Sequence, residues 1–415
     1  MSFRKIRLSG ICFCLFTPLA WGQEPLPSIE ELWNIIQRQQ VEIDELRTQL
    51  EATQADTAKT TERVEVTENQ IEATGDFVEA LASEQSAPSK TTIAGYGELH
   101  YNNFDSGSGR EDEIDFHRFV LYFGHEFNER TRLFSELELE HSLAGDDKPG
   151  EIELEQAYID FKLNEQLSVM GGLFLLPVGI LNETHEPNTF YGVERNDVEN
   201  IIIPTTWWEA GAAMYGHFDN GLSWNAAVHS GLAIPTEGSS AFRVRSGRQK
   251  VAEALASDPA YTLRLKYTGL PGLELAASYQ YQSDASQVAN DGLDAGHLLS
   301  AQARFSRGPF SLTGLYGAWR FNGSGAEAAG ADHQSGWYIE PSWRFNSRWG
   351  VYARYEDLDG ARVTDQFTQT EFGFNFWPVP AVVVKFDYRD RTHDLPGAQG
   401  KDFSAIDLGI GYAFN

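Results

Sequence analysis

From residue 92 to residue 415, apolar residues alternate with polar or small ones in segments of about ten residues. In the last segment, Ile406, Leu408 and Ile410 fall on one face, whereas Asp407 and Gly409 fall on the other. Successive side chains of a β-strand point to opposite sides, so each segment predicts a strand with one apolar and one polar face. Strands with one face suited to lipid and one to water are typical of a transmembrane β-barrel.

The alternating segments number sixteen, and an even number is expected of a single-chain bacterial barrel. Seven connections are short and eight are long, which predicts that both barrel ends lie on the short-turn, periplasmic side. We therefore predict an all-β fold, a 16-stranded antiparallel outer-membrane β-barrel over residues 92–415. The strands are centred near residues 97, 120, 137, 157, 171, 212, 227, 263, 277, 301, 315, 340, 353, 372, 385 and 409. The short turns are expected at 128–130, 164–166, 219–221, 270–272, 307–309, 346–348 and 378–380.

The N-terminus has the pattern of a secretory signal peptide. Three basic residues precede an apolar run at 8–20, and a small-residue cleavage site ends at Gly22. We predict a signal peptide over residues 1–22. Both cysteines, Cys12 and Cys14, fall inside it, so the mature chain is expected to contain neither a disulfide nor a thiolate-bound metal.

Residues 23–85 carry a heptad repeat, which predicts an α-helical coiled coil in the periplasm, joined to the barrel by a linker at 86–91. The repeat is apolar at its ends and rich in threonine between them, so the seam alone does not choose between two and three strands. A single amphipathic helix is the alternative. The two seam series are Ile29, Ile36, Ile43, Leu50, Thr57, Val64, Ile71 and Val78, and Leu32, Gln39, Leu46, Thr53, Thr60, Thr67, Thr74 and Leu81.

The alternation also predicts which charged side chains enter the lumen. A charge facing lipid at the midplane costs about 2 to 4 kcal/mol, so charged strand residues are expected to point inward. They either contact solutes or form a structural network, and both alternatives stay open. The expected lumen residues are Arg118, Glu136, Glu138, Glu140, Arg264, Lys266, Arg304, Arg344, Arg354, Lys385 and Arg389.

Two connections, 178–206 and 233–258, are long enough to have a function of their own. The first follows the fifth strand and is predicted to turn into the lumen as a constriction loop. Its expected constriction residues are Glu183, Glu186, Glu194, Arg195, Asp197 and Glu199. The second carries a basic cluster, interpreted as a surface contact with the phosphates of outer-membrane lipid and lipopolysaccharide: Arg243, Arg245, Arg248 and Lys250.

Composition narrows the classes of function. The formal net charge of −28 argues against a nucleic-acid partner, because binding phosphates requires a basic patch. The chain contains neither a G-x-S-x-G motif nor a P-loop, and its ten histidines form neither an HExxH motif nor a cluster with ligand spacing. We therefore expect no enzyme, no cofactor and no metal site.

Four short stretches resemble the phosphate-selective porin O and P family of Gram-negative outer membranes: QAYID at 156–160, LPVG at 176–179, VER at 193–195 and WEAG at 208–211. The resemblance implies a homotrimer of sixteen-stranded barrels, each narrowed by its third long loop. Anion-selective members of the family have basic ladders, whereas this loop carries five carboxylates and only one arginine.

The first hypothesis is therefore an outer-membrane porin through which small hydrophilic solutes and ions diffuse passively, with a constriction of mixed or acidic charge. A phosphate- or anion-selective porin is the alternative within the same class. An envelope tether that acts through the coiled coil is the alternative from another class.

Overall fold

The computed structural model describes residues 33, 40, 90–105, 109–393, 398 and 401–415. The predicted signal peptide, coiled coil and most of the linker fall outside this part, apart from two isolated positions. No helix among the described residues is long and apolar enough to cross a membrane.

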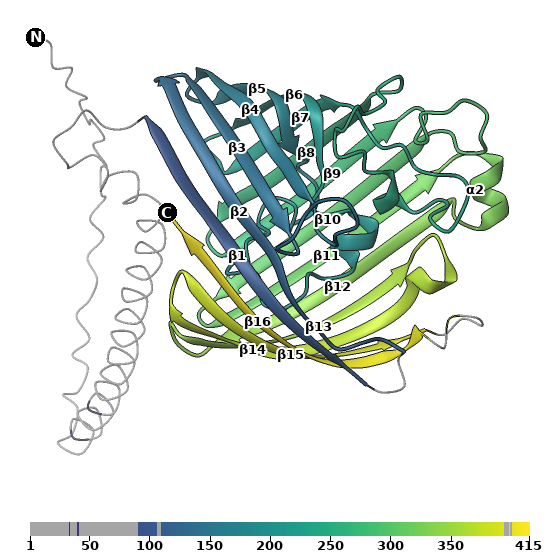
Figure 1. The fold of residues 1–415 in the computed structure, drawn as a ribbon. Helices are drawn as coiled ribbons and strands as arrows, with labels where there is room; N and C mark the ends of the chain where they lie inside the picture. The colour runs from purple at the N-terminus through teal and green to yellow at the C-terminus, as the bar shows by residue number, and fades with distance from the viewer. Residues whose placement is uncertain (1–32, 34–39, 41–89, 106–108, 394–397, 399–400) are drawn as a thin grey trace, which may run out of the picture. The chain divides into compact units, whose positions relative to one another are not determined.

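In the described part of the chain, sixteen strands pair antiparallel with their sequence neighbours, and β16 pairs with β1 to close the barrel (Figure 1). Every predicted strand centre lies inside a strand, so the predicted barrel is confirmed. The strands are β1 Thr91–Phe104, β2 Glu113–Asn128, β3 Thr131–Glu140, β4 Ile152–Asn164, β5 Leu167–Leu175, β6 Trp208–His217, β7 Leu222–His229, β8 Ala260–Leu270, β9 Leu273–Gln282, β10 Gly296–Arg307, β11 Phe310–Phe321, β12 His333–Arg344, β13 Trp349–Asp359, β14 Gln366–Val379, β15 Val382–Thr392 and β16 Phe403–Phe414.

Burial alternates along the strands as the sequence pattern requires. In β8, Leu263 and Leu265 are exposed on the outside, whereas Thr262 and Arg264 are buried on the inside. The alternation breaks at Glu155 of β4, where the pairing with β3 slips by one residue. This β-bulge turns the Glu155 side chain inward, where it is buried.

The third loop, residues 176–207, lies inside the barrel. Its backbone bonds to strands on opposite sides of the lumen: the Val193 N–H donates to Asp387 of β15 (2.7 Å), and the Pro177 carbonyl accepts from Ser278 of β9 (2.7 Å). Glycines on the inner wall allow this close approach. A Cβ at Gly336 of β12 would lie only 3.2 Å from Ile202 of the loop.

The buried core lies between the loops and the strands, with most of its strand residues on β10 to β14 and others on β5 to β7. The third loop contributes a π-helical turn, Val198–Ile202, and the fourth loop, residues 230–259, contributes a 3₁₀ turn, Val244–Gly247. A 3₁₀ turn at Val363–Asp365 and the helix α2, Ser324–Ala329, lie in later loops. The core side chains include Val198, Ile202, Leu232, Ile234, Val244, Leu298, Leu315, Trp319, Tyr338, Leu358 and Phe367.

Candidate functional site

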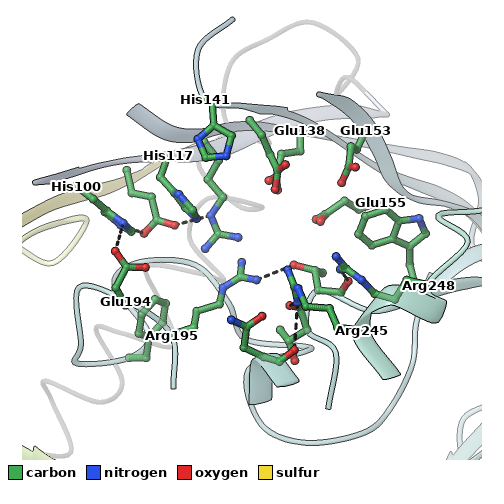
Figure 2. A pocket seen from close by; sticks show the side chains of 18 of the residues that line it. His100, His117, Glu138, His141, Glu153, Glu155, Glu194, Arg195, Arg245 and Arg248 are labelled. Atoms are coloured by element: carbon green, nitrogen blue, oxygen red, sulfur yellow. Dashed lines mark hydrogen bonds and ion pairs between the residues drawn. The ribbon is translucent and has the colours of Figure 1, made fainter. Parts of the chain in front are cut away.

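A cavity of about 260 Å³ remains on the other side of the lumen, between the loops and strands β1 to β4 (Figure 2). The strands supply one wall and the third and fourth loops supply the other. The residues that line it are Glu98, His100, His117, Arg118, Glu138, Glu140, His141, Glu153, Glu155, Phe190, Val193, Glu194, Arg195, Asn200, Thr205, Thr206, Trp208, Arg245 and Arg248.

The strand wall is rich in carboxylates. Glu138 and Glu155 are each about 2 % exposed, and Glu153 is also buried. The Oε2 atom of Glu138 has no hydrogen-bond partner among the described residues. This wall therefore presents buried carboxyl groups whose hydrogen bonding the surrounding protein only partly satisfies.

The loop wall is basic. Arg245 and Arg248 bond to backbone carbonyls, Arg245 to that of Thr205 (2.5 Å) and Arg248 to that of Thr206. Arg195 donates to the Thr206 hydroxyl (2.9 Å), and its Nε and Nη2 atoms find no partner in the described part of the chain. Among the ion pairs of the described residues, none involves these three arginines.

The local backbone explains why the two loop arginines act together. They lie three residues apart around the 3₁₀ turn Val244–Gly247, and in a 3₁₀ helix side chains at this spacing eclipse one another. Burial, and secondarily the neighbouring Arg248, lowers the pKa of Arg245 to about 9, so it stays charged at neutral pH. Burial also lowers the pKa of Arg248. Two cations held this close favour an anion between or beside them.

Most carboxylates of the third loop are bound within the fold and do not reach the cavity. Glu183 pairs with Arg264, Asp197 pairs with Arg391, and Glu186 accepts only a long bond from a tyrosine hydroxyl (3.4 Å). Glu199 accepts the N–H groups of residues 180 and 181, each at 2.7 Å, and burial raises its pKa to about 7.

Of the predicted loop residues, only Glu194 and Arg195 line the cavity. Burial disfavours the charged form of Glu194, but the His100 imidazole at 3.0 Å outweighs it and holds the pKa of this carboxyl well below its usual range. The third loop therefore brings one of its five carboxylates and its single arginine to the cavity, in keeping with mixed charge.

Most of the predicted strand residues form local ion pairs or hydrogen bonds, so their cations do not form a basic ladder like that of the anion-selective family members. Arg118 bonds to Glu98 (2.5 Å) and Glu136 accepts from Gln156 (2.5 Å). Lysines and arginines elsewhere are also engaged: Lys266 with Glu274, Arg354 with Glu340, Glu356 and Glu371, Arg389 with Asp407, Lys385 with the Gly192 carbonyl, and Arg344 with the Ser347 carbonyl and the Trp377 ring. Arg304 lies opposite Glu274 in the register of β9 and β10.

Sequence reasoning missed the two cavity arginines of the fourth loop. The basic cluster of this loop predicts a surface contact with lipid phosphates, but Arg245 and Arg248 line the cavity. The other two members of that basic cluster have partners: Arg243 bonds to Asp365 (2.7 Å), and Lys250 bonds to Glu151 (2.5 Å). The R-x-x-R spacing within a long loop was the only local signal of an inward pair.

The closed barrel with a loop folded into its lumen defines the class, an outer-membrane porin. The family model for phosphate-selective porin O and P matches residues 94–414, so the chain belongs to that family. A relative from Aquifex aeolicus (strain VF5), described as an uncharacterized protein, is 31 % identical over 339 residues, which cover 72 % of this chain and 74 % of the relative.

Solved structures agree at the level of the fold. An anion-selective porin from Comamonas acidovorans has a TM-score of 0.54 at 13 % identity and covers 78 % of this chain and 99 % of its own. Salmonella typhi OmpF in complex with daunomycin has a TM-score of 0.54 at 12 % identity, with 78 % and 97 % covered. OmpT of Vibrio cholerae in its trimer form has a TM-score of 0.51 at 9 % identity, with 78 % and 98 % covered. The protein is thus a channel of the Gram-negative outer membrane.

Proposed function

We propose that small hydrophilic solutes and ions diffuse passively through the cavity, and that its two opposed walls set the charge preference of the channel. The observation that carries this proposal is the three arginines without carboxylate partners, Arg195, Arg245 and Arg248, on the loops, facing the glutamates of β3 and β4 (Figure 2). The combination favours solutes that carry both signs of charge, together with small anions that contact the loop wall.

The physical basis is a transverse field. Opposite charges on facing walls of a narrow, poorly solvated passage orient a dipolar solute across it. Charges that are already paired, such as Arg354 among its three carboxylates, contribute little to this field, because their potential is largely cancelled nearby. The three arginines that lack a carboxylate partner among the described residues therefore dominate this field.

A phosphate-selective channel is the alternative that the family description favours. Arginine is well suited to it, since its planar guanidinium presents several donors to phosphate or carboxylate oxygens. The buried carboxyl groups of the strand wall argue against phosphate selectivity, because an anion that contacts the arginines also approaches Glu138 and Glu155. We therefore place mixed selectivity before strict anion selectivity.

Reversal potentials across a planar bilayer in a salt gradient test the proposal. The wild-type channel should discriminate weakly between ions. Arg245→Gln with Arg248→Gln should shift the potential toward cations, because two positive charges leave the loop wall. Arg243→Gln is the matched control, since it lies on the same loop but is bound to Asp365 outside the cavity lining.

Each result is decisive. A wild-type protein without conductance would refute the porin function. Strong anion preference in the wild type would favour the phosphate alternative, and an unchanged potential in the double variant would show that these arginines do not set selectivity.

Assembly and attachment are separate proposals. The fold family favours a homotrimer embedded in outer-membrane lipid and lipopolysaccharide. Crosslinking in native membranes tests this assembly.

Deletion of residues 24–85 tests the tether alternative. Loss of envelope attachment with unchanged conductance would assign tethering to that segment, whereas the porin function predicts that conductance persists.

A further inference from the structure

Three potential metal ligands, Asp115, His117 and His141, meet beside the cavity, and the two histidines belong to its strand wall (Figure 2). The register explains how they meet. Arg118 of β2 pairs with Glu140 of β3, and the ladder continues by one residue, since the His141 N–H donates to the His117 carbonyl (3.0 Å). The two histidines are therefore direct cross-strand neighbours, and Asp115 lies two residues before one of them.

A β-bulge aims this group into the lumen. Between Asp115 and Arg118, β2 contains one residue more than the facing stretch of β1. Such a bulge redirects side chains, and as a result the consecutive residues His117 and Arg118 both line the cavity. His141, directly after β3, has a φ of 51°, a conformation that turns the chain back at the strand end.

The ligand atoms already converge. The Nδ1 atoms of His117 and His141 lie 3.2 Å and 2.8 Å from the same Asp115 oxygen, and the ligand atoms of all three residues lie within 4.8 Å of one another. Tetrahedral zinc with ligand bonds of about 2.0 to 2.1 Å needs ligand atoms about 3.4 Å apart, so small side-chain adjustments suffice.

The surroundings suit a cation that enters from water. The three side chains are 21 to 34 % exposed, so an ion in the lumen can reach them. The ring of His100 stacks on His117 with centroids 4.7 Å apart, which holds that imidazole in place. Two nitrogens and one carboxylate form a donor set that suits zinc and its transition-metal neighbours, whereas calcium and magnesium prefer oxygen ligands alone.

Two other clusters in the described residues do not have this character. His185 lies between Glu136 and Glu155, so this group offers a single imidazole, and all three of its side chains are buried. The group that contains Glu151 and Glu153 is already bridged by the Lys250 ammonium. Among the described residues, only the Asp115 group combines two imidazoles, ligand atoms that converge, and side chains that an ion in the lumen can reach.

We propose that Asp115, His117 and His141 bind a divalent transition-metal ion, with Zn²⁺ as the best match, and that its remaining coordination positions face the cavity. Bound Zn²⁺ places two positive charges on the carboxylate wall and so moves the channel toward anion preference. The site departs from the sequence-based expectation of no metal site, because its ligands come from two strands. It does not depend on the selectivity proposed above.

Calorimetric titration of Zn²⁺ into the purified, chelator-treated full-length protein tests the site. We expect one Zn²⁺ per chain, and at least about tenfold weaker binding in His117→Gln, His141→Gln and Asp115→Asn. Visible absorption of bound Co²⁺ should report nitrogen ligation in the wild type and diminish in the histidine variants. His125→Gln, on the same strand but bonded to Thr91 away from the cluster, is the matched control.

Thermal unfolding of each variant in detergent with chelator, equal to that of the wild type, verifies that the barrel is intact. The proposal is overturned if the wild type binds no Zn²⁺, if the three variants bind it as tightly as the wild type, or if His125→Gln weakens binding equally. Because binding is measured without ion flow, a failed metal site is distinguishable from a failed porin.

Discussion

Beside strands β10 to β14 the lumen is filled by apolar side chains of the loops, whereas beside β1 to β4 it keeps a cavity lined by charged groups. The same third loop borders both. One part of it carries Val198 and Ile202, which pack against the wall, and another carries Glu194 and Arg195, which face the cavity. The packed side holds the loop in position, and the open side is where we propose that solutes pass. Substitutions should therefore reduce stability on the first side and change selectivity on the second.

The largest effect is expected from Ile202→Ala. The side chain is fully buried against β11 and β12, and its loss should remove about 2 to 5 kcal/mol of packing. A loosened loop should raise the single-channel conductance and its noise, measured in planar bilayers. Ile339→Ala is the control, because that residue lies 43 % exposed on the outer face. Equal conductance in the two variants would contradict the packed role of the loop.

The next effect concerns pH. Burial raises the folded-state pKa of Glu199 to about 7, above the ordinary 4.5, so the fold favours the protonated carboxyl. Its contribution to stability is complete below about pH 4.5 and is lost as the pH rises through about 7, with an upper limit of about 3 kcal/mol.

Glu199→Gln keeps an oxygen acceptor for the backbone N–H groups but does not titrate. Thermal unfolding in detergent at about pH 4 and about pH 8 should therefore show a larger loss of stability in the wild type than in this variant. The comparison between the two proteins cancels the other titrating groups. An identical pH dependence would show that the pKa of Glu199 is the same in the folded and unfolded states.

The smallest effect on stability is expected on the cavity side. Glu138→Gln replaces a carboxyl group whose Oε2 has no partner among the described residues, so the free energy of unfolding should change by less than about 1 kcal/mol. The reversal potential should nevertheless shift toward anions. Glu165→Gln, at an exposed turn and paired only with Lys162, serves as the control. A large loss of stability without a change in selectivity would reverse the roles assigned to the two sides.

The barrel was predictable because its signal is local and repeated. Alternation located every strand, and residues such as Asn128 and Asn164, whose side chains accept backbone N–H bonds in the short turns, marked where strands end. The alternation along the strands also predicted that the side chains of Glu136 and Arg354 point inward, and both are buried there. The alternation breaks near Glu155 and predicts no face there, and the structure shows a β-bulge at this point.

The site was less predictable, because charge along the chain does not reveal which charges pair. Glu183, Asp197 and Glu199 suggested an acidic constriction, yet an arginine of β8, an arginine of β15 and two backbone amides bind them. The arginines 245 and 248 suggested a lipid contact, yet a 3₁₀ turn directs them into the cavity.

The sequence by itself determined the sixteen strands, their order and their inner and outer faces, since these follow from a two-residue period and from turns between neighbouring segments. Only the tertiary structure decided how the third loop crosses the lumen, which charges remain unpaired there, and that Asp115, His117 and His141 meet. Each of these depends on contacts between residues far apart in the chain or on a shift of register, and neither leaves a periodic mark in the sequence.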